Sequence, residues 1–282
     1  RQRQMCIRDS NEFNYKIEDS RYFLARLLKI WKQQGIKIHI TAGPNYTPAD
    51  VALLHVDTTV VADEYLDLSS RYPVVLNEKV KDILKTTISK YLLKKDDSYQ
   101  GPVIVKTNEN YGGVNEFINA VKTGQSAWYD PEVERPWRKR VIMDSLKYPV
   151  FDKLSAVPLG VWKNDKLIVE RFLPERLDNG DYRCRTYYFF GEQEFGAWMT
   201  SPKPVIKSSV ANAVGLLDEI PQALRDIRNA SGFNYGKFDY TEVDGEVYLY
   251  DMNKTPAASP KLIELSSNDK WEDFANEIHN FG

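Results

Sequence analysis

The stretch GKFDYTEVDGEVYLYDMNKTP, residues 236–256, decides the fold expected for this chain. Residues 236–243 and 246–251 have the composition of two strands, and the Asp244-Gly245 pair between them is a strong signal for a tight hairpin turn. Two such strands pair in antiparallel fashion, so the start of one lies beside the end of the other. The sequence therefore predicts an antiparallel hairpin near the C-terminus.

Polar side chains gather at one end of this hairpin. Asp239 stands on the first strand, and Asp251 and Asn253 stand at the end of the second, where Thr255-Pro256 stops it. Residues two apart on a strand point to the same face. Two carboxylates and an amide oxygen are hard ligands that suit Mg²⁺ or Mn²⁺, although a solvated hairpin face is the alternative for an acidic pair. We expect a metal site of Asp239, Asp251 and Asn253.

A lysine and a glycine pair stand earlier in the chain. Lys106 ends the apolar run 103–105, and Gly112-Gly113 follows within seven positions. A lysine at a strand end can reach phosphate oxygens, and glycines let backbone N–H groups approach a phosphate closely. Neither the Gly-Lys-Ser/Thr order of a P-loop nor a Gly-x-Gly-x-x-Gly fingerprint is present.

Apolar periodicity predicts alternating helices and strands, and hence an α/β fold. The expected helices are 22–34, ended by Gly35, and 63–72, 78–95 and 212–228; the expected strands include 36–41, 51–56, 73–76, 157–162, 166–172 and 185–190. Residues 122–148 are rich in Trp, Arg and Pro and are expected to form an insertion or surface subdomain. Residues 1–10 show no periodicity and resemble a non-native or truncated leader, so we leave them out of the expected fold.

Composition excludes some classes of function. The 282 residues are 42% hydrophobic and carry a net charge of −2, which gives no overall attraction to nucleic acid or anionic membranes. Two cysteines make no disulfide framework, and no apolar run approaches a membrane span, so a cytoplasmic protein is expected.

Taken in order, five stretches resemble the ATP-grasp superfamily, over roughly residues 76–259. They are Leu76-Asn77 before a helix with Ile-Leu-Lys85, Gly101 to Lys106, Gly112-Gly113, Ile168 to Leu173, and Asp239 through Asp251-Met-Asn253-Lys-Thr-Pro256. The resemblance implies a small N-terminal βαβ-like unit over 11–77 and two ATP-grasp lobes over 78–167 and 168–282.

The resemblance also implies roles for particular residues. Lys106 resembles the lysine that contacts the α- and β-phosphates, and Lys85, or in its place Lys90, the second ATP lysine. Arg185 resembles the arginine that neutralises the transferred phosphate. The hinge that reads adenine corresponds to Glu170, Arg171, Phe172 and Leu173, and the ribose carboxylate to Glu175 or Asp178.

Two departures from the family pattern are visible. Many relatives have Glu where Asp251 stands, and the glycine-rich loop holds only one Gly-Gly pair. The resemblance implies an ATP-dependent carboxylate–amine ligase acting through an acyl phosphate, with ATP and Mg²⁺ or Mn²⁺ as cofactors and an unknown small-molecule or peptide carboxylate as partner. A small-molecule kinase or an inactive nucleotide-binding module stays open, as does the oligomeric state.

Other conspicuous residues have simpler interpretations. The basic cluster around Trp137 is expected to be charged surface, the three histidines are too scattered for a zinc site, and Cys184 is expected to be structural. Asp57 follows the strand 51–56, and ligands favour strand ends in α/β sheets, so Asp57 is a candidate substrate contact.

Overall fold

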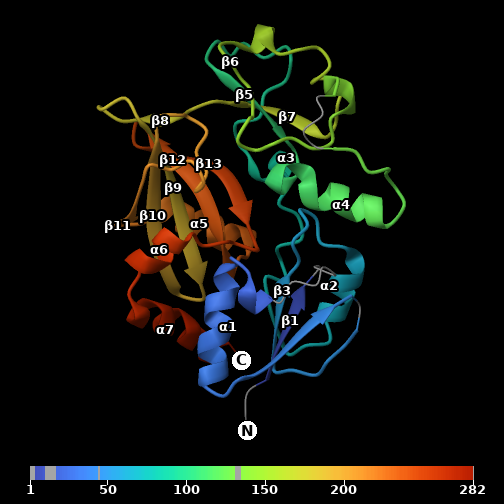
Figure 1. Cartoon of the computed structure of the whole chain (residues 1–282), viewed down its shortest axis with the longest axis vertical. Helices are drawn as coiled ribbons and strands as arrows, with labels where there is room; N and C mark the ends of the chain where they lie inside the picture. Colours follow the sequence, from blue (N-terminus) through green and yellow to red (C-terminus); the bar gives the residue numbers. More distant parts are fainter. Residues whose placement is uncertain (1–3, 10–16, 44, 131–134, 282) are drawn as a thin grey trace.

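The computed structural model describes residues 4–9, 17–43, 45–130 and 135–281, and these form three sheets flanked by helices (Figure 1). The N-terminal sheet is parallel, with the strand order β2-β1-β3-β4. Its strands are β1 (Gln4–Asp9), β2 (Lys37–Ala42), β3 (Val51–His55) and β4 (Val74–Leu76), and its helices are α1 (Phe23–Gln33) and α2 (Asp63–Ser69).

The largest sheet has the order β11-β10-β9-β12-β13, with β8 paired to β9. Its strands are β8 (Glu175–Arg176), β9 (Tyr182–Phe190), β10 (Gln193–Ser201), β11 (Ala213–Leu217), β12 (Tyr235–Val243) and β13 (Glu246–Asn253). A smaller sheet has the order β6-β5-β7, from β5 (Val103–Thr107), β6 (Val150–Phe151) and β7 (Leu167–Arg171). The remaining α-helices described are α3 (Lys85–Ile88), α4 (Val114–Lys122), α5 (Gln222–Ser231), α6 (Pro260–Leu265) and α7 (Asn268–Asn276).

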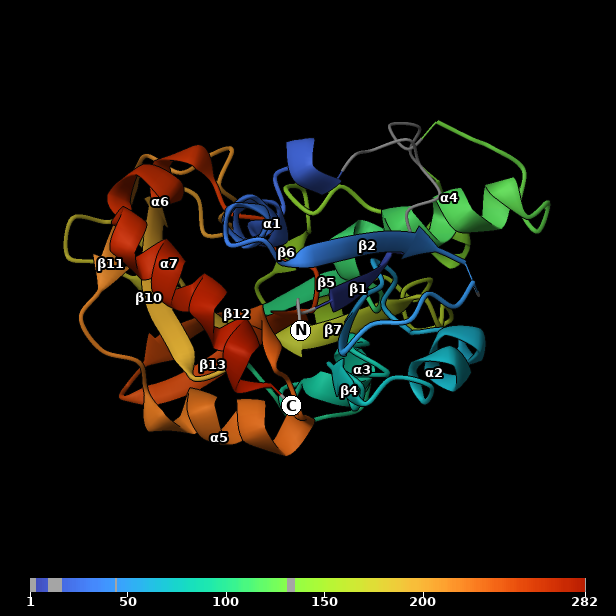
Figure 2. The same ribbon diagram turned by 90° about the horizontal axis from the view of Figure 1, so that it is seen from below.

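Strand β9 is buried on both faces. Tyr188 and Phe190 face a core that includes α1, α6 and α7, whereas Tyr187 and Phe189 face a core that includes α5. This follows from the two-residue period of a strand, and Figure 2 shows α5 on one side of the large sheet and α6 and α7 on the other. The large sheet, which carries the β12–β13 hairpin, thus lies between two layers of helices.

Most of the expected elements are confirmed, including the α/β class and the hairpin. Helix 22–34 is α1, with Gly35 at φ 76° after it, and strands 36–41, 51–56 and 73–76 are β2, β3 and β4. No helix among the described residues is long and apolar enough to cross a membrane.

The expected helix over 78–95 is wrong, because only Lys85–Ile88 are helical. The backbone N–H groups of this segment donate to distant carbonyls instead, Ile83 to Thr59, Lys85 to Asn108 and Leu93 to Val169. Tertiary pairing has overridden local helix propensity here.

Three further expectations differ from the structure. Residues 157–162 form turns rather than a strand, and residues 213–217, expected to be helical, form the edge strand β11. The exclusion of residues 1–10 is wrong for Gln4–Asp9, which form β1 between β2 and β3, with Met5, Cys6 and Ile7 fully buried. Residues 1–3 and 10 lie outside the described residues.

We expect Phe238→Ala to lower the free energy of unfolding by about 3 to 5 kcal/mol, because it leaves a cavity in the core. Phe238 is fully buried and contacts the rings of Phe189 and Phe233 at centroid distances of 5.0 and 5.2 Å. Urea denaturation measures the change. Leu265→Ala, at a side chain that is 48% exposed, is the control, and equal losses for the two variants would contradict this core.

Candidate functional site

The hairpin of β12 and β13 places two carboxylates opposite each other. Asp239 and Asp251 are direct partners in the antiparallel register, and Lys237 faces Asn253. The turn has Asp244 at φ 53° and Gly245 at φ 80°, the two positive values that a type I′ hairpin turn requires. Asp239 and Asp251 therefore lie opposite each other, and Asn253 follows two residues after Asp251 on β13.

Lys85 and Lys237 compensate these carboxylates; Lys85 is buried, and the Lys237 side chain is 17% exposed. Lys237 Nζ lies 3.0 Å from Asp239 Oδ2, and Lys85 Nζ lies 3.7 Å from Asp251 Oδ1. Burial acts to lower the pKa of Lys237, but the Asp239 carboxylate outweighs it and the pKa lies above its usual value. Burial lowers the pKa of Lys85, an effect that Asp251 opposes. The Thr186 hydroxyl also donates to Asp239 Oδ1, at 3.1 Å.

These oxygens are a donor set that fits a magnesium ion. Asp251 Oδ1 is buried and accepts no hydrogen bond from the described residues, so it can take a cation. Across residues 4–9, 17–43, 45–130 and 135–281, no group of three His, Cys, Asp or Glu side chains could hold a metal ion. Asn253 stands two residues after Asp251 on β13 and carries an amide oxygen, the third ligand that the sequence predicts.

Lys106 and Glu170 form a buried ion pair between β5 and β7. Lys106 Nζ also lies 3.5 Å from the carbonyl oxygen of Tyr250 on β13, so the pair connects the smaller sheet to the hairpin. Glu170 Oε1 has no hydrogen-bond partner in the part of the chain that the structure describes. A ligand that donates a hydrogen bond could satisfy this oxygen.

The second lysine contacts the glycine-containing loop. Lys85 Nζ donates to the Glu109 carbonyl and to Asn110 Oδ1, both at 3.2 Å. Gly112 and Gly113 have φ of 68° and 75°, and a Cβ at Gly112 would lie 2.0 Å from the Met143 carbonyl oxygen. Only glycine fits there, and α4 begins directly afterwards. The backbone N–H groups at the start of a helix are suited to binding phosphate.

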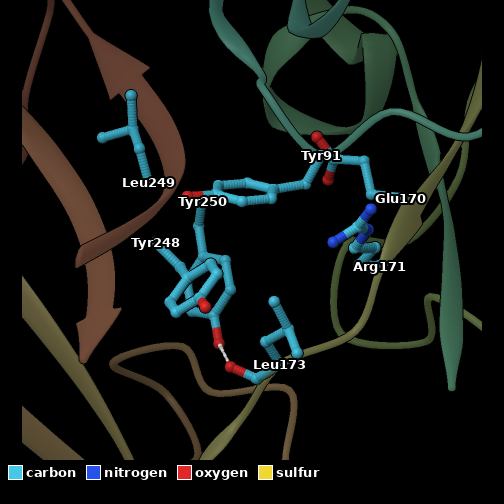
Figure 3. A pocket seen from close by; sticks show the side chains of 7 residues that line it. All are labelled: Tyr91, Glu170, Arg171, Leu173, Tyr248, Leu249 and Tyr250. Carbon is cyan, nitrogen blue, oxygen red and sulfur yellow. Dashed lines mark hydrogen bonds between the residues drawn. The ribbon is translucent and has the colours of Figure 1, made fainter. Parts of the chain in front are cut away.

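A pocket lies between the hinge residues and β13 (Figure 3). Its lining comprises Tyr91, Glu170, Arg171, Leu173, Tyr248, Leu249 and Tyr250. The Tyr250 hydroxyl donates to the Leu173 carbonyl at 2.9 Å, as the figure draws, and the Tyr91 and Tyr248 rings lie 4.8 Å apart. Aromatic walls beside a buried carboxylate suit a flat base with hydrogen-bond donors. Phe172, between Arg171 and Leu173, is buried in the core that packs against the smaller sheet.

Two other predicted residues bind each other. Glu175 accepts from Arg185 Nε at 2.9 Å and from Arg185 Nη2 at 2.8 Å, a bidentate pair, and Arg183 Nη1 lies 3.3 Å from the same carboxylate. Arg185 also pairs with Glu242 at 3.1 Å. Glu175 and Arg185 therefore lie together, each engaged with the other.

The alternatives left open by the sequence are located too. Lys90 and Asp178 are both exposed, whereas Lys85 is 3% exposed and faces Asp251. Sequence reasoning missed Lys237, although its position two residues before Asp239 puts it on the same strand face. It also missed Asn110, which donates to the Met252 carbonyl at 2.9 Å and joins the glycine loop to β13.

The sequence matches no protein-family model and no curated protein. Solved structures do resemble it. The ATP-grasp ligase PsnB, solved with a minimal precursor, Mg and ADP, has a TM-score of 0.56 at 9% identity over 98% of this chain and 96% of its own. D-alanyl-alanine synthetase A from Vibrio cholerae has a TM-score of 0.52 at 11% identity, over 99% and 98%.

A third similarity is to the macrocyclase MdnC from Microcystis aeruginosa, solved with the precursor peptide MdnA. Its TM-score is 0.50 at 11% identity, over 98% of this chain and 99% of that chain. At identities this low, the structural similarity shows the fold alone. The substrate and the reaction have to be inferred from the site itself.

We expect Lys106→Met to lower the free energy of unfolding by about 3 to 5 kcal/mol, because it leaves the Glu170 carboxylate buried without its cation. The two side chains are 8% and 6% exposed. The double variant Lys106→Met/Glu170→Met should recover most of that loss in urea denaturation. A double variant that is less stable than Lys106→Met alone would contradict this account of the pair.

Proposed function

From the ATP-grasp fold of this chain, we propose that it is an ATP-dependent carboxylate–amine ligase that works through an acyl phosphate. The observation that carries the proposal is the convergence of Lys85 and Lys106 with the opposed carboxylates Asp239 and Asp251. Cations for phosphate and oxygen ligands for Mg²⁺ are the two requirements of phosphoryl transfer.

Binding of the nucleotide would use residues from both sides of the pocket. The adenine would lie among Tyr91, Tyr248 and Tyr250, with Glu170 accepting from its amino group. The phosphates would replace the groups that Lys85 and Lys106 now contact, since a lysine serves as a point charge for phosphate.

Asp239, Asp251 and Asn253 would hold the metal. Mg²⁺, when bound, neutralises charge on the phosphates and bridges them to the protein. The lysines and Arg185 would stabilise the charge that develops on the transferred group. For Arg185 to take this role, its pair with Glu175 would have to break. The Glu175 carboxylate would then be available to hold the ribose.

The reaction has two balanced steps. A substrate carboxylate oxygen attacks the γ-phosphorus of ATP, and ADP leaves with the bonding electron pair. An amine nitrogen then attacks the acyl carbon, the C–O bond to phosphate breaks, and the amine proton leaves with the phosphate. Positioning and charge neutralisation perform this chemistry, so no nucleophilic side chain is needed.

We expect Mg-ATP, at about 100 times its Kd, to raise the thermal midpoint of the wild-type protein by about 5 to 10 °C. The variant Asp251→Ala/Asn253→Ala should lose the part of the shift that depends on Mg²⁺, because it lacks two of three metal ligands. Asp273→Ala, at an exposed carboxylate of α7, is the matched control. A well-folded wild type with no shift at millimolar Mg-ATP would contradict the proposal.

With a carboxylic acid substrate, we expect hydroxylamine to trap a hydroxamate in the presence of Mg-ATP, since it attacks an acyl phosphate as an amine does. The measurement is a screen of carboxylic acids and peptides for ADP release, with hydroxamate detection. ADP release that yields a stable phosphate ester and no hydroxamate would instead assign a kinase. Nucleotide binding without ADP release would assign an inactive binding module.

A further inference from the structure

The side-chain amide of Asn253 is oriented by Thr255. The Thr255 backbone N–H donates to Asn253 Oδ1 at 2.8 Å. Because an N–H group can only donate, the atom that faces it is the amide oxygen. An amide oxygen has two lone pairs, and this bond occupies one of them. The second lone pair is the one that a cation at Asn253 would use.

The Thr255 hydroxyl is placed to compete for that second lone pair. Its Oγ1 lies 3.2 Å from Asn253 Oδ1 and 2.5 Å from Asp57 Oδ1. A hydroxyl has a single proton to donate, and Thr255 is only 4% exposed, so its proton goes to one of these two oxygens. The carboxylate oxygen is closer and is the stronger acceptor. The proton therefore points to Asp57 and away from Asn253.

Asp57 is fixed for this contact by two other groups. The Tyr22 hydroxyl donates to Asp57 Oδ2 at 2.6 Å, and Asn115 Nδ2 donates to the Asp57 carbonyl at 2.8 Å. Asp57 follows the end of β3, so the N-terminal parallel sheet supplies this carboxylate. A side chain 196 residues away in sequence thus controls the hydrogen bonding around Asn253.

We propose that Asp57 is a positioning residue for the metal site: it takes the Thr255 proton and so leaves Asn253 Oδ1 available to Mg²⁺. This inference rests on the metal role of Asn253 given in the proposed function. It assigns to the N-terminal sheet a part in metal binding without a direct ligand. Partners that orient metal ligands in this way commonly change metal affinity by about 10- to 100-fold.

The test titrates Mg²⁺ at fixed ADP and records the thermal midpoint. In Asp57→Asn, the amide oxygen can keep the Tyr22 bond while the NH₂ group donates to Thr255 Oγ1. The Thr255 proton then turns to Asn253 Oδ1, and the Mg²⁺ concentration for half of the metal-dependent shift should rise about tenfold. The shift produced by ADP without Mg²⁺ should stay at the wild-type value.

A second substitution separates this mechanism from simple loss of charge or fold. Thr255→Val removes the competing proton with little change in shape, so Asp57→Asn/Thr255→Val should return to within about threefold of the wild-type Mg²⁺ requirement. Asp63→Asn is the matched control, because it makes the same substitution at an exposed carboxylate of α2 and should leave the Mg²⁺ requirement unchanged.

Two results would overturn the inference while leaving the proposed function intact. One is a wild-type Mg²⁺ requirement in Asp57→Asn. The other is a double variant as weak as Asp57→Asn, which would mean that the lost charge alone weakens binding. A wild-type protein whose midpoint never responds to Mg²⁺ with ADP would overturn the proposed metal site itself, and this inference with it.

Discussion

The organisation of the site depends on holding two like charges, Asp239 and Asp251, directly opposite each other on an antiparallel pair of strands. Such a pair is destabilising on its own. The chain offsets the repulsion with Lys237 from the same strand as Asp239 and with Lys85 from a distant segment. Lys85 reaches Asp251 only because residues around it follow the path set by long-range backbone hydrogen bonds rather than a continuous helix. Compensation of the Asp251 charge at the hairpin therefore depends on the irregular course of residues 78–95.

The same strand end joins the three sheets. Lys106 of the smaller sheet contacts the Tyr250 carbonyl, and Asn110 of the glycine loop contacts the Met252 carbonyl. Lys254 is buried, with burial lowering its pKa to about 8, and it donates to the Thr59 carbonyl beyond β3. Each contact is made from the end of β13 to a different part of the chain. Motion between these parts would change the spacing of lysines and carboxylates, so the arrangement of the sheets sets the geometry of the site.

Elements with strong local signals could be predicted from sequence. The Asp244-Gly245 turn sets the register beside it, with Val243 opposite Glu246, and a β-bulge between Asp239 and Tyr240 then shifts the pairing by one residue and brings Asp239 opposite Asp251. Residues 78–95 and 213–217 were mispredicted because their apolar side chains fit either a helix or packing against a sheet, and tertiary hydrogen bonds decide between them. The contact of Thr255 with Asp57 spans 198 residues and has no local pattern, so only the folded chain reveals it.

Each cation of the site is paired with a carboxylate. Lys106 pairs with Glu170, and Arg185 pairs with Glu175 and Glu242, so neither cation is left without a carboxylate. Such pairs add little stability relative to apolar residues of similar size, since desolvation offsets the Coulomb attraction. Under the proposed function, ligands would take the place of the present partners in these ion pairs. A phosphate would replace a carboxylate beside a lysine, and Mg²⁺ would replace a lysine beside a carboxylate. The charges would be compensated before and after binding. Under the proposed function, binding of nucleotide and binding of metal would favour each other, because each would release the partner that the other needs.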